Sequence, residues 1–243
     1  MFFKPFSSYG VATIEEVKVG KRLNEAMKLI DKNKAYAIDE AVVLLKETAK
    51  AKFDETIEIH IRLGIDSKRS DQIVRGTMSL PYGIGRIRRV AVLVKGEKQK
   101  EAEVSGADIV GFDDLIENIS KFKIDFDILV ATPDVMKDLS KVAKILGPKG
   151  LMPNPKSGTV TFEIARAVKE FKQGKIEYKN DSFGIIHVPV GKASFEKEKL
   201  SCNAKALIEA VLKSKPSNSK GQYIKSIFMA STMGPSIFVE RKV

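Results

Sequence analysis

Two kinds of strand pattern occur in this chain, and their order restricts the folds it can adopt. Residues 53–63 alternate between apolar and polar side chains, which predicts a half-buried strand of an antiparallel sheet. Residues 89–94, 107–110 and 126–131 are instead apolar runs separated by helical segments, which predicts parallel strands covered on both faces. The apolar positions of the alternating segment are Ile57, Ile59, Ile61 and Leu63.

Half-exposed alternation returns after Gly174. The predicted elements of this part are a hairpin with strands at 176–178 and 185–190 around a turn at 180–184, a helix at 196–212, and closing strands at 223–230 and 236–239. The two chain ends therefore share an α+β pattern and enclose a βαβ pattern.

This order predicts a parallel α/β domain inserted into an α+β domain. The α+β domain would consist of residues 1–82 and 175–243, and the inserted domain of residues 83–174. The chain would cross between them at residues 80–85 and at Gly174-Lys175, where glycines suit a hinge but equally suit ordinary turns. A length of 243 residues is sufficient for two such domains.

Three helices are predicted besides the one near the C-terminus. Residues 37–50 combine an apolar face with two acids in the first turn. Residues 132–146 begin with Thr-Pro-Asp, a favourable N-cap and first turn, and Gly147 is expected to end that helix. A further helix is expected at 163–171. The buried stripe of the 132–146 helix would be Leu139, Val142, Ala143 and Leu146.

Charge is the strongest compositional signal. The chain has 42 Lys and Arg against 31 Asp and Glu, a net charge of +11. This excess favours a polyanionic partner, either nucleic acid or an anionic membrane. Hydrophobic residues make up 43% and charged residues 30%, as in a globular protein, and no apolar run is long enough for a membrane-spanning helix. The single cysteine, Cys202, cannot form an internal disulfide.

The first residues do not have the pattern of a secretory signal, because Pro5 interrupts a short apolar stretch and no long apolar core follows. We expect residues 1–17 to be a flexible extension, and an organelle-targeting segment stays open as an alternative.

Residues 147–160 combine three Gly, three Pro and two Lys, and are expected to be neither helix nor strand. Such a cationic loop is either a long surface connection or a contact surface for a partner.

The sequence offers little for catalysis. His60, His187 and the single cysteine show no zinc spacing and no catalytic-triad pattern. The glycines of residues 83–85 precede a strand, whereas a dinucleotide-binding glycine motif follows one. Gly174-Lys175 and Gly191-Lys192 lack the Ser or Thr that completes a phosphate-binding loop. We therefore expect no enzymatic activity, cofactor or metal.

Three cationic segments are better matched to a phosphate backbone. They are residues 137–156, with five Lys against one Asp, residues 213–225, with four Lys and no acid, and residues 86–89, with three Arg. Each alone is more often a solvated surface, but together with the net charge they favour contact with nucleic acid.

Seven short segments, in the same order, resemble the large-subunit ribosomal protein L-one family. The segments are Lys52–Thr56, Gly64–Asp66, Gly76–Pro81, Ala131–Asp134, Gly147–Val160, Val190–Phe195 and Thr232–Pro235. The resemblance extends from about Lys18 to Val239, nearly the whole chain. It implies an rRNA-binding α+β domain made from both chain ends and an inserted Rossmann-like, three-layer α/β domain, in agreement with the boundaries above.

The resemblance further implies which residues bind structured rRNA. They are Lys52, Phe53, Thr56, Glu58, Asp181, Ser226, Thr232, Met233 and Gly234. Because phosphates repel carboxylates, Glu58 and Asp181 would have to meet base donors or 2′-hydroxyls. From the residues alone, Phe53 is equally a core aromatic, Glu58 a solvated strand position and Thr232–Gly234 a turn.

A role at the mobile lateral stalk of the ribosome is also implied by the resemblance, with release of tRNA from the exit site and repression of the protein's own operon mRNA. Lys149 and Lys156 would face the tRNA. The implied partners are large-subunit rRNA, exit-site tRNA, the operon mRNA and other ribosomal components, with no membrane; the protein would be cytoplasmic, ribosome-associated and monomeric when free. Ser182 and Phe183 stand where the family commonly has a lysine, which puts a phosphate contact there in doubt.

Two other functions stay open on the residues alone. A nucleotide-dependent enzyme built on the central domain would bind a dinucleotide or nucleoside triphosphate saturably. A nonspecific nucleic-acid binder would be held by charge and would discriminate little between RNAs.

Overall fold

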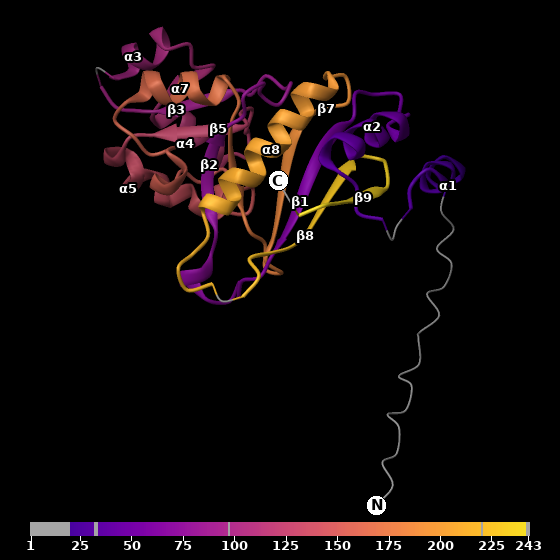
Figure 1. The fold of residues 1–243 in the computed structure, drawn as a ribbon. Coiled ribbons are helices and arrows are strands. Elements are labelled where there is room, and N and C mark those ends of the chain that lie inside the picture. Colours follow the sequence, from indigo (N-terminus) through magenta and orange to yellow (C-terminus); the bar gives the residue numbers. More distant parts are fainter. Residues whose placement is uncertain (1–19, 32–33, 97, 220, 242–243) are drawn as a thin grey trace, which may run out of the picture.

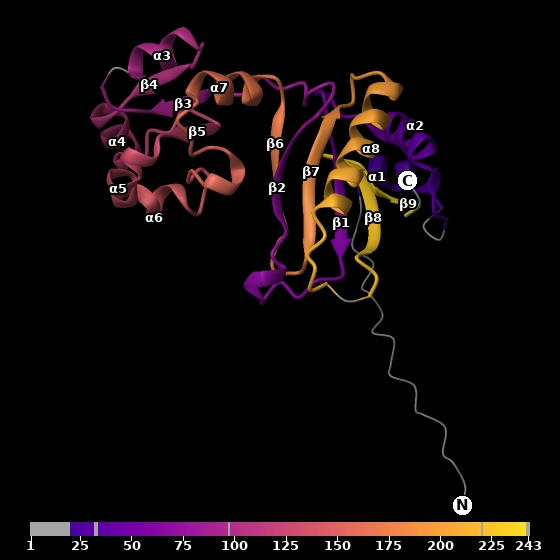
Figure 2. The same ribbon diagram turned by 60° about the vertical axis from the view of Figure 1, so that its left-hand side comes forward.

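The computed structural model describes residues 20–31, 34–96, 98–219 and 221–241, and the predicted extension at residues 1–17 lies outside these ranges. Within them the chain forms a mixed α/β structure with three sheets (Figures 1 and 2). A four-stranded antiparallel sheet has the order β7-β1-β8-β9, a two-stranded ribbon pairs β2 with β6, and a three-stranded parallel sheet has the order β4-β3-β5. No helix in the described ranges is long and apolar enough to cross a bilayer.

The four-stranded sheet packs one face against two helices. Its strands are β1 (Thr56–Leu63), β7 (Ile185–Lys192), β8 (Ile224–Ser231) and β9 (Ser236–Val239), and its helices are α2 (Ile38–Thr48) and α8 (Lys197–Lys213). The predicted alternation in β1 is confirmed, since Ile57, Ile59 and Ile61 are fully buried. They share one apolar cluster with Leu45 of α2 and Leu207 of α8. A short helix that the sequence did not predict, α1 (Lys21–Lys28), lies beside β9 (Figure 1).

The ribbon of β2 (Arg75–Ser79) and β6 (Lys175–Lys179) corrects the predicted hairpin. β6 pairs antiparallel with β2. Among the described residues, the two strands predicted to form the hairpin are linked only by an isolated β-bridge between Asn180 and Ile186. The reason is Asn180, whose side-chain oxygen accepts the Val74 N–H at 2.8 Å while its own N–H donates to the Val74 carbonyl. These bonds tie the end of β6 to the chain just before β2.

The parallel sheet consists of β3 (Val90–Leu93), β4 (Ile109–Gly111) and β5 (Ile128–Ala131), which confirms the parallel strands expected there. Successive residues of β3 and β5 enter two separate apolar clusters, one on each face. One face packs against α4 (Asp113–Ser120) and the turns at 133–146, and the other against α3 (Lys98–Val104) and α7 (Ile164–Lys172). The sheet is therefore the middle of three layers (Figure 1).

The single helix predicted at 132–146 is wrong. The segment divides into 3₁₀ turns at 133–135 and 140–142 and two one-turn helices, α5 (Met136–Leu139) and α6 (Ala143–Leu146). The Ser140 hydroxyl donates to the Lys137 carbonyl at 2.6 Å, and such local bonds compete with a regular helix. Leu139, Val142 and Leu146 are buried as predicted, Ala143 is half-buried, and the Thr132 side chain makes no capping bond.

Two glycines meet where the chain passes between the ribbon and the parallel sheet. Gly83 has φ +64° and Gly174 has φ +100°. A Cβ at Gly174 would lie 2.6 Å from the Gly83 Cα, which is closer than packed atoms approach. The Asn203 side chain of α8 donates to the Gly83 carbonyl at 3.0 Å. Close approach and left-handed backbone therefore both require glycine at position 174.

Candidate nucleic-acid interface

The face of the four-stranded sheet opposite α2 and α8 carries partly exposed side chains from every strand. On β1 this face presents Thr56, Glu58, His60 and Arg62. Directly opposite on β8, Ser226 pairs with Arg62 and Ala230 pairs with Glu58. This polar row is the side of the predicted alternation that was expected to be solvated.

At the start of β1, Glu55 joins the two loops that carry most of the predicted rRNA-binding residues. Its carboxylate is 2% exposed and accepts the N–H groups of Ala51, at 2.9 Å, and Met233, at 3.0 Å. Burial by itself would raise the pKa of Glu55, but the hydrogen bonds from Met233 and Ala51 outweigh it and lower the pKa. The carboxylate is therefore ionised at neutral pH and fixes one loop against the other.

Glu55 was missed as a site residue by the sequence prediction, although the pattern contained a signal for it. In the alternation of residues 53–63 it falls on the same side as Ile57 and Ile59, where an acid is not expected. An acid on the core side of a strand points to a buried hydrogen-bond acceptor with a structural task.

Thr56 and Thr232 are held together by three hydrogen bonds. The Thr232 hydroxyl accepts the Thr56 N–H at 3.0 Å and donates to the Thr56 carbonyl, and the Thr232 N–H donates to that same carbonyl. The Lys192 ammonium donates to the Thr56 hydroxyl at 2.9 Å. Two predicted residues that are far apart in the sequence are thus neighbours in space.

The same end of the sheet presents two apolar side chains to solvent. Phe53 is 54% exposed and Met233 is 52% exposed, so the alternative that Phe53 is a core aromatic is wrong. Gly234 closes the turn by donating to the Ser231 carbonyl at 3.1 Å, and a Cβ there would collide with the Ser231 hydroxyl. We call these residues the loop cluster: Lys52, Phe53, Thr56, Thr232, Met233 and Gly234.

The remaining predicted residues lie elsewhere on the sheet. Asp181 and Ser226, the turn cluster, lie toward the end of β1 where Arg62 pairs with Ile185 and Ser226. Arg62 is six residue steps along β1 from Thr56, which corresponds to about 20 Å. Glu58 lies between the clusters, nearer the loop cluster. The structure therefore divides the predicted set into two groups along one face.

Asp181 has a structural task within the turn cluster. One carboxylate oxygen accepts the N–H groups of Phe183, at 2.9 Å, and Ile185, at 2.7 Å, and the other lies 3.6 Å from Nε2 of His187. Burial would raise the pKa of Asp181, but the bonds from Ile185 and Phe183 outweigh it and lower the pKa. The ionised carboxylate therefore organises the turn that precedes β7.

Acid unfolding tests this task of Asp181. Because the pKa of Asp181 is lower in the folded state, its ionised carboxylate stabilises the fold fully above the unfolded-state pKa of about 3.9. This stabilisation is lost as pH falls through the folded-state pKa. We expect Asp181→Asn to be less stable than wild type at pH 6 and nearly equal to it at pH 2.5, measured by urea unfolding. Equal stability at pH 6 would contradict this role.

The loop at 147–160 is irregular as predicted, apart from a 3₁₀ turn at Pro155–Ser157. The Asn154 side chain accepts the Lys156 N–H at 2.8 Å and caps that turn. Lys149 and Lys156 are exposed, whereas Ser157 is buried. Part of this loop lines a cleft whose other lining residues are Arg75, Glu177, Lys179 and His187.

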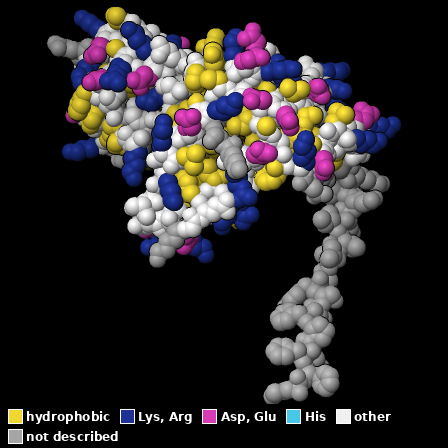
Figure 3. Space-filling view, viewed as in Figure 1, with side chains coloured by type: hydrophobic (Ala, Val, Ile, Leu, Met, Phe, Trp, Pro, Cys, Tyr) yellow, Lys and Arg dark blue, Asp and Glu magenta, His cyan; other side chains and the backbone are white. Residues whose placement is uncertain are grey.

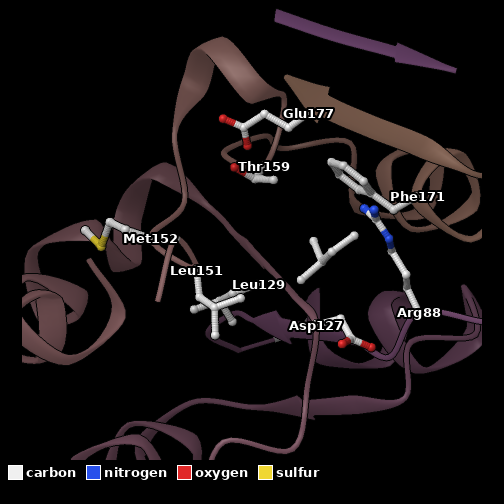
Figure 4. A pocket seen from close by; sticks show the side chains of 10 residues that line it. Arg88, Asp127, Leu129, Leu151, Met152, Thr159, Phe171 and Glu177 are labelled. Carbon is white, nitrogen blue, oxygen red and sulfur yellow. The ribbon is translucent and has the colours of Figure 1, made fainter. Parts of the chain in front are cut away.

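A pocket beside the parallel sheet bears on the enzyme alternative. Arg88, Asp127 and Glu177 line it together with apolar side chains that include Phe171 (Figure 4). Burial lowers the pKa of Arg88, with Asp127 opposing the shift. Because Asp127 immediately precedes β5, the pocket lies at the amino end of that strand, whereas nucleotide sites lie beyond the carboxyl ends. The pocket therefore gives no support to a nucleotide-dependent enzyme.

Positive and negative side chains are mixed on the face of the molecule shown in Figure 3, where Lys and Arg are interspersed with Asp and Glu. A net charge of +11 raises affinity for polyanions generally, without selecting one shape. Any selectivity must come from shaped groups of residues such as the two clusters.

A basic α/β protein with a polar sheet face and ordered loops at one end of it has the features of a nucleic-acid-binding protein. The model of the Ribosomal protein L1p/L10e family matches residues 45–235, well over half of the sequence. The chain belongs to this family, which confirms the resemblance seen in the sequence. Membership implies a non-enzymatic structural constituent of the ribosome that binds rRNA.

Proposed function

We propose that this protein binds large-subunit rRNA at the mobile lateral stalk through the loop and turn clusters. The main support is that the buried Glu55 carboxylate accepts hydrogen bonds from both loops of the loop cluster, and so holds Phe53 and Met233 in a fixed arrangement. A prearranged surface of this kind binds RNA with less ordering cost than two independent loops would. In this proposal residues 1–82 and 175–243 form the rRNA-binding domain, and residues 83–174 form the inserted domain.

Glu58 gives the proposed surface a means of discrimination. Its cross-strand neighbours are Ala230 and Pro189, whose side chains cannot pair with a carboxylate. An ionised carboxylate on an RNA-binding face is repelled by phosphates, and it accepts hydrogen bonds from base amino groups or 2′-hydroxyls. The surface would therefore recognise RNA by base edges and shape in addition to charge.

Binding of the stalk fragment of large-subunit rRNA, beside a scrambled RNA of equal length, tests this function. We expect a preference of about a thousandfold or more, retained at high salt, because shape and base contacts depend less on counterion release than phosphate contacts do. Equal binding of both RNAs that collapses with salt would contradict the proposal and favour a nonspecific binder.

Glu58→Ala separates specific from charge-driven binding. We expect the affinity for the stalk RNA to fall by about tenfold or more, because an acceptor for base or sugar donors is lost. The matched control is Glu209→Ala, which removes an exposed acid from α8, on the other side of the sheet. A small rise in affinity for both variants, measured by filter binding, would show that only net charge matters.

The proposal extends to tRNA and to the protein's own mRNA. Lys149 and Lys156, both exposed on the loop of the inserted domain, would approach tRNA leaving the exit site. In ribosomes carrying Lys149→Ala with Lys156→Ala, we expect slower release of deacylated tRNA; an unchanged rate would contradict this contact.

The protein would also repress translation of its own operon mRNA by binding the leader RNA. Binding of this leader no tighter than a scrambled RNA would contradict that repression. The protein would be cytoplasmic, and monomeric when free.

A further inference from the structure

Four aromatic rings lie in register across the exposed face of the four-stranded sheet. His187 of β7 is the partner of His60 on β1, His60 is also the partner of Phe228 on β8, and Phe228 is the partner of Phe238 on β9. Each of the four strands thus contributes one ring to a single line. We call this line the aromatic row.

The two rings at each end of the row are in contact with each other. Nδ1 of His60 lies 2.8 Å from Nδ1 of His187, and the two ring centroids are 5.0 Å apart. The centroids of Phe228 and Phe238 are 5.2 Å apart, with the rings tilted by 38°. Paired positions on adjacent strands place His60 and Phe228 side by side as well. The rings are partly or largely exposed, so their surfaces are available to a ligand.

Hollows adjoin both ends of the row. His187 borders the cleft that Arg75, Glu177 and Lys179 line, where Arg75 is ion-paired with Glu177 and Lys179 adds a further cation. Phe228 and Phe238 border a groove that Met27 and Ile30 line beside α1. The row therefore leads from a cleft with charged side chains to an apolar groove across the middle of the sheet.

We propose that the aromatic row is a stacking platform for unpaired bases of the RNA, between the loop cluster and the turn cluster. The inference rests on the proposed function, because an RNA that contacts both clusters must pass over the row. Every base has a π-face that stacks on aromatic side chains, and aromatic rings on the open face of a four-stranded sheet are a known means of holding single-stranded RNA.

Electrostatics at the row favour bases over phosphates. Burial, and then the proximity of His187, lower the pKa of His60, while Glu58 opposes the shift. His60 is therefore neutral at pH 7, and the Nδ1–Nδ1 contact needs one ring nitrogen without a proton as the acceptor. The Asp181 carboxylate lies 3.6 Å from Nε2 of His187, and Glu58 precedes His60 by two residues on the same face of β1. Arg62 follows His60 by two residues on that face, and Lys192 lies opposite Thr56 at the start of β1. Bases would thus stack on the rings, and phosphates would meet the cations beside them.

Phe228→Leu tests the platform, because leucine keeps an apolar side chain but has no ring. We expect the affinity for the stalk RNA to fall by about fivefold or more, from the loss of one stacked base. The slope of log affinity against log salt should stay unchanged, because no phosphate contact is lost. Phe228→Tyr, which keeps the ring, should bind like wild type, and so should the control Phe162→Leu, which removes an exposed ring near the parallel sheet.

Fluorescence of RNA carrying 2-aminopurine at unpaired positions gives a second readout. We expect at least one position to be quenched by wild type and by Phe228→Tyr, and less by Phe228→Leu. Unchanged affinity and quenching with Phe228→Leu would overturn the platform, and so would an equal loss with Phe228→Tyr. A wild-type protein that does not prefer the stalk RNA would instead refute the proposed function itself, so the two failures are distinguishable.

Discussion

Glu55→Gln is expected to cost more RNA affinity than any other single change outside the RNA-contacting residues. Glutamine offers one acceptor oxygen, so either the Ala51 or the Met233 N–H would face an amide donor instead of a carboxylate. An unsatisfied buried N–H costs about 1–3 kcal/mol, and one of the two loops would be released. We expect a loss of about that much in the free energy of unfolding, and stalk RNA binding weaker by about a hundredfold.

The pH dependence of stability provides an internal check on Glu55. Because its pKa is lowered by folding, its stabilisation is present above the unfolded pKa of about 4.3 and disappears as pH falls through the folded value. The difference between wild type and Glu55→Gln, measured by urea unfolding, should therefore shrink below about pH 4. Glu47→Gln, an exposed acid of α2, is the matched control and should change neither stability nor binding. Equal behaviour of the two variants would contradict the role of Glu55.

Gly174→Ala is expected to be the most destabilising of the small substitutions. At φ +100° an alanine is strained, by about 1–2 kcal/mol, and its Cβ would lie 2.6 Å from the Gly83 Cα, which adds a backbone displacement of about 1–3 kcal/mol. The total of roughly 2–5 kcal/mol is measurable as a shift of the urea midpoint.

Gly150→Ala separates the two contributions. Gly150 has φ +71°, but a Cβ there would meet no atom within 4 Å. We therefore expect this variant to show the backbone strain alone, about 1–2 kcal/mol. If Gly174→Ala were no more destabilising than Gly150→Ala, the contact with Gly83 would not be the reason for a glycine at position 174.

Strands could be predicted wherever a few consecutive residues show which side chains are buried. The alternation in residues 53–63 and the apolar runs at 89–94 and 126–131 are such patterns, and their apolar side chains do lie in the core. The errors arise where one polar side chain overrides such a pattern. Asn180 ties the end of β6 to the chain before β2 through bonds with Val74, and the Ser140 hydroxyl bonds to the Lys137 carbonyl where the predicted helix is divided. Val74 is 106 residues from Asn180 and cannot be identified as its partner from the local sequence.

The site was less accessible to the sequence than the fold. Thr56 and Thr232 are neighbours because β8 lies beside β1, and strand order is a property of the whole chain. The residues in question were named through the family resemblance, and from the residues alone Phe53 was equally a core aromatic. The aromatic row could not be found before the registers of β7, β1, β8 and β9 were known.

The contact between Gly83 and Gly174 has a consequence for how the chain could be shortened. The points at which the polypeptide leaves the ribbon and returns to it are adjacent, so no gap would have to be bridged if everything between them were removed. Direct ligation of the two ends would leave β2 paired with β6 and would replace a long detour by a tight turn. If the proposed division into two domains is right, the parallel sheet would be a detachable module, and a miniature of the protein would retain the exposed face of the four-stranded sheet.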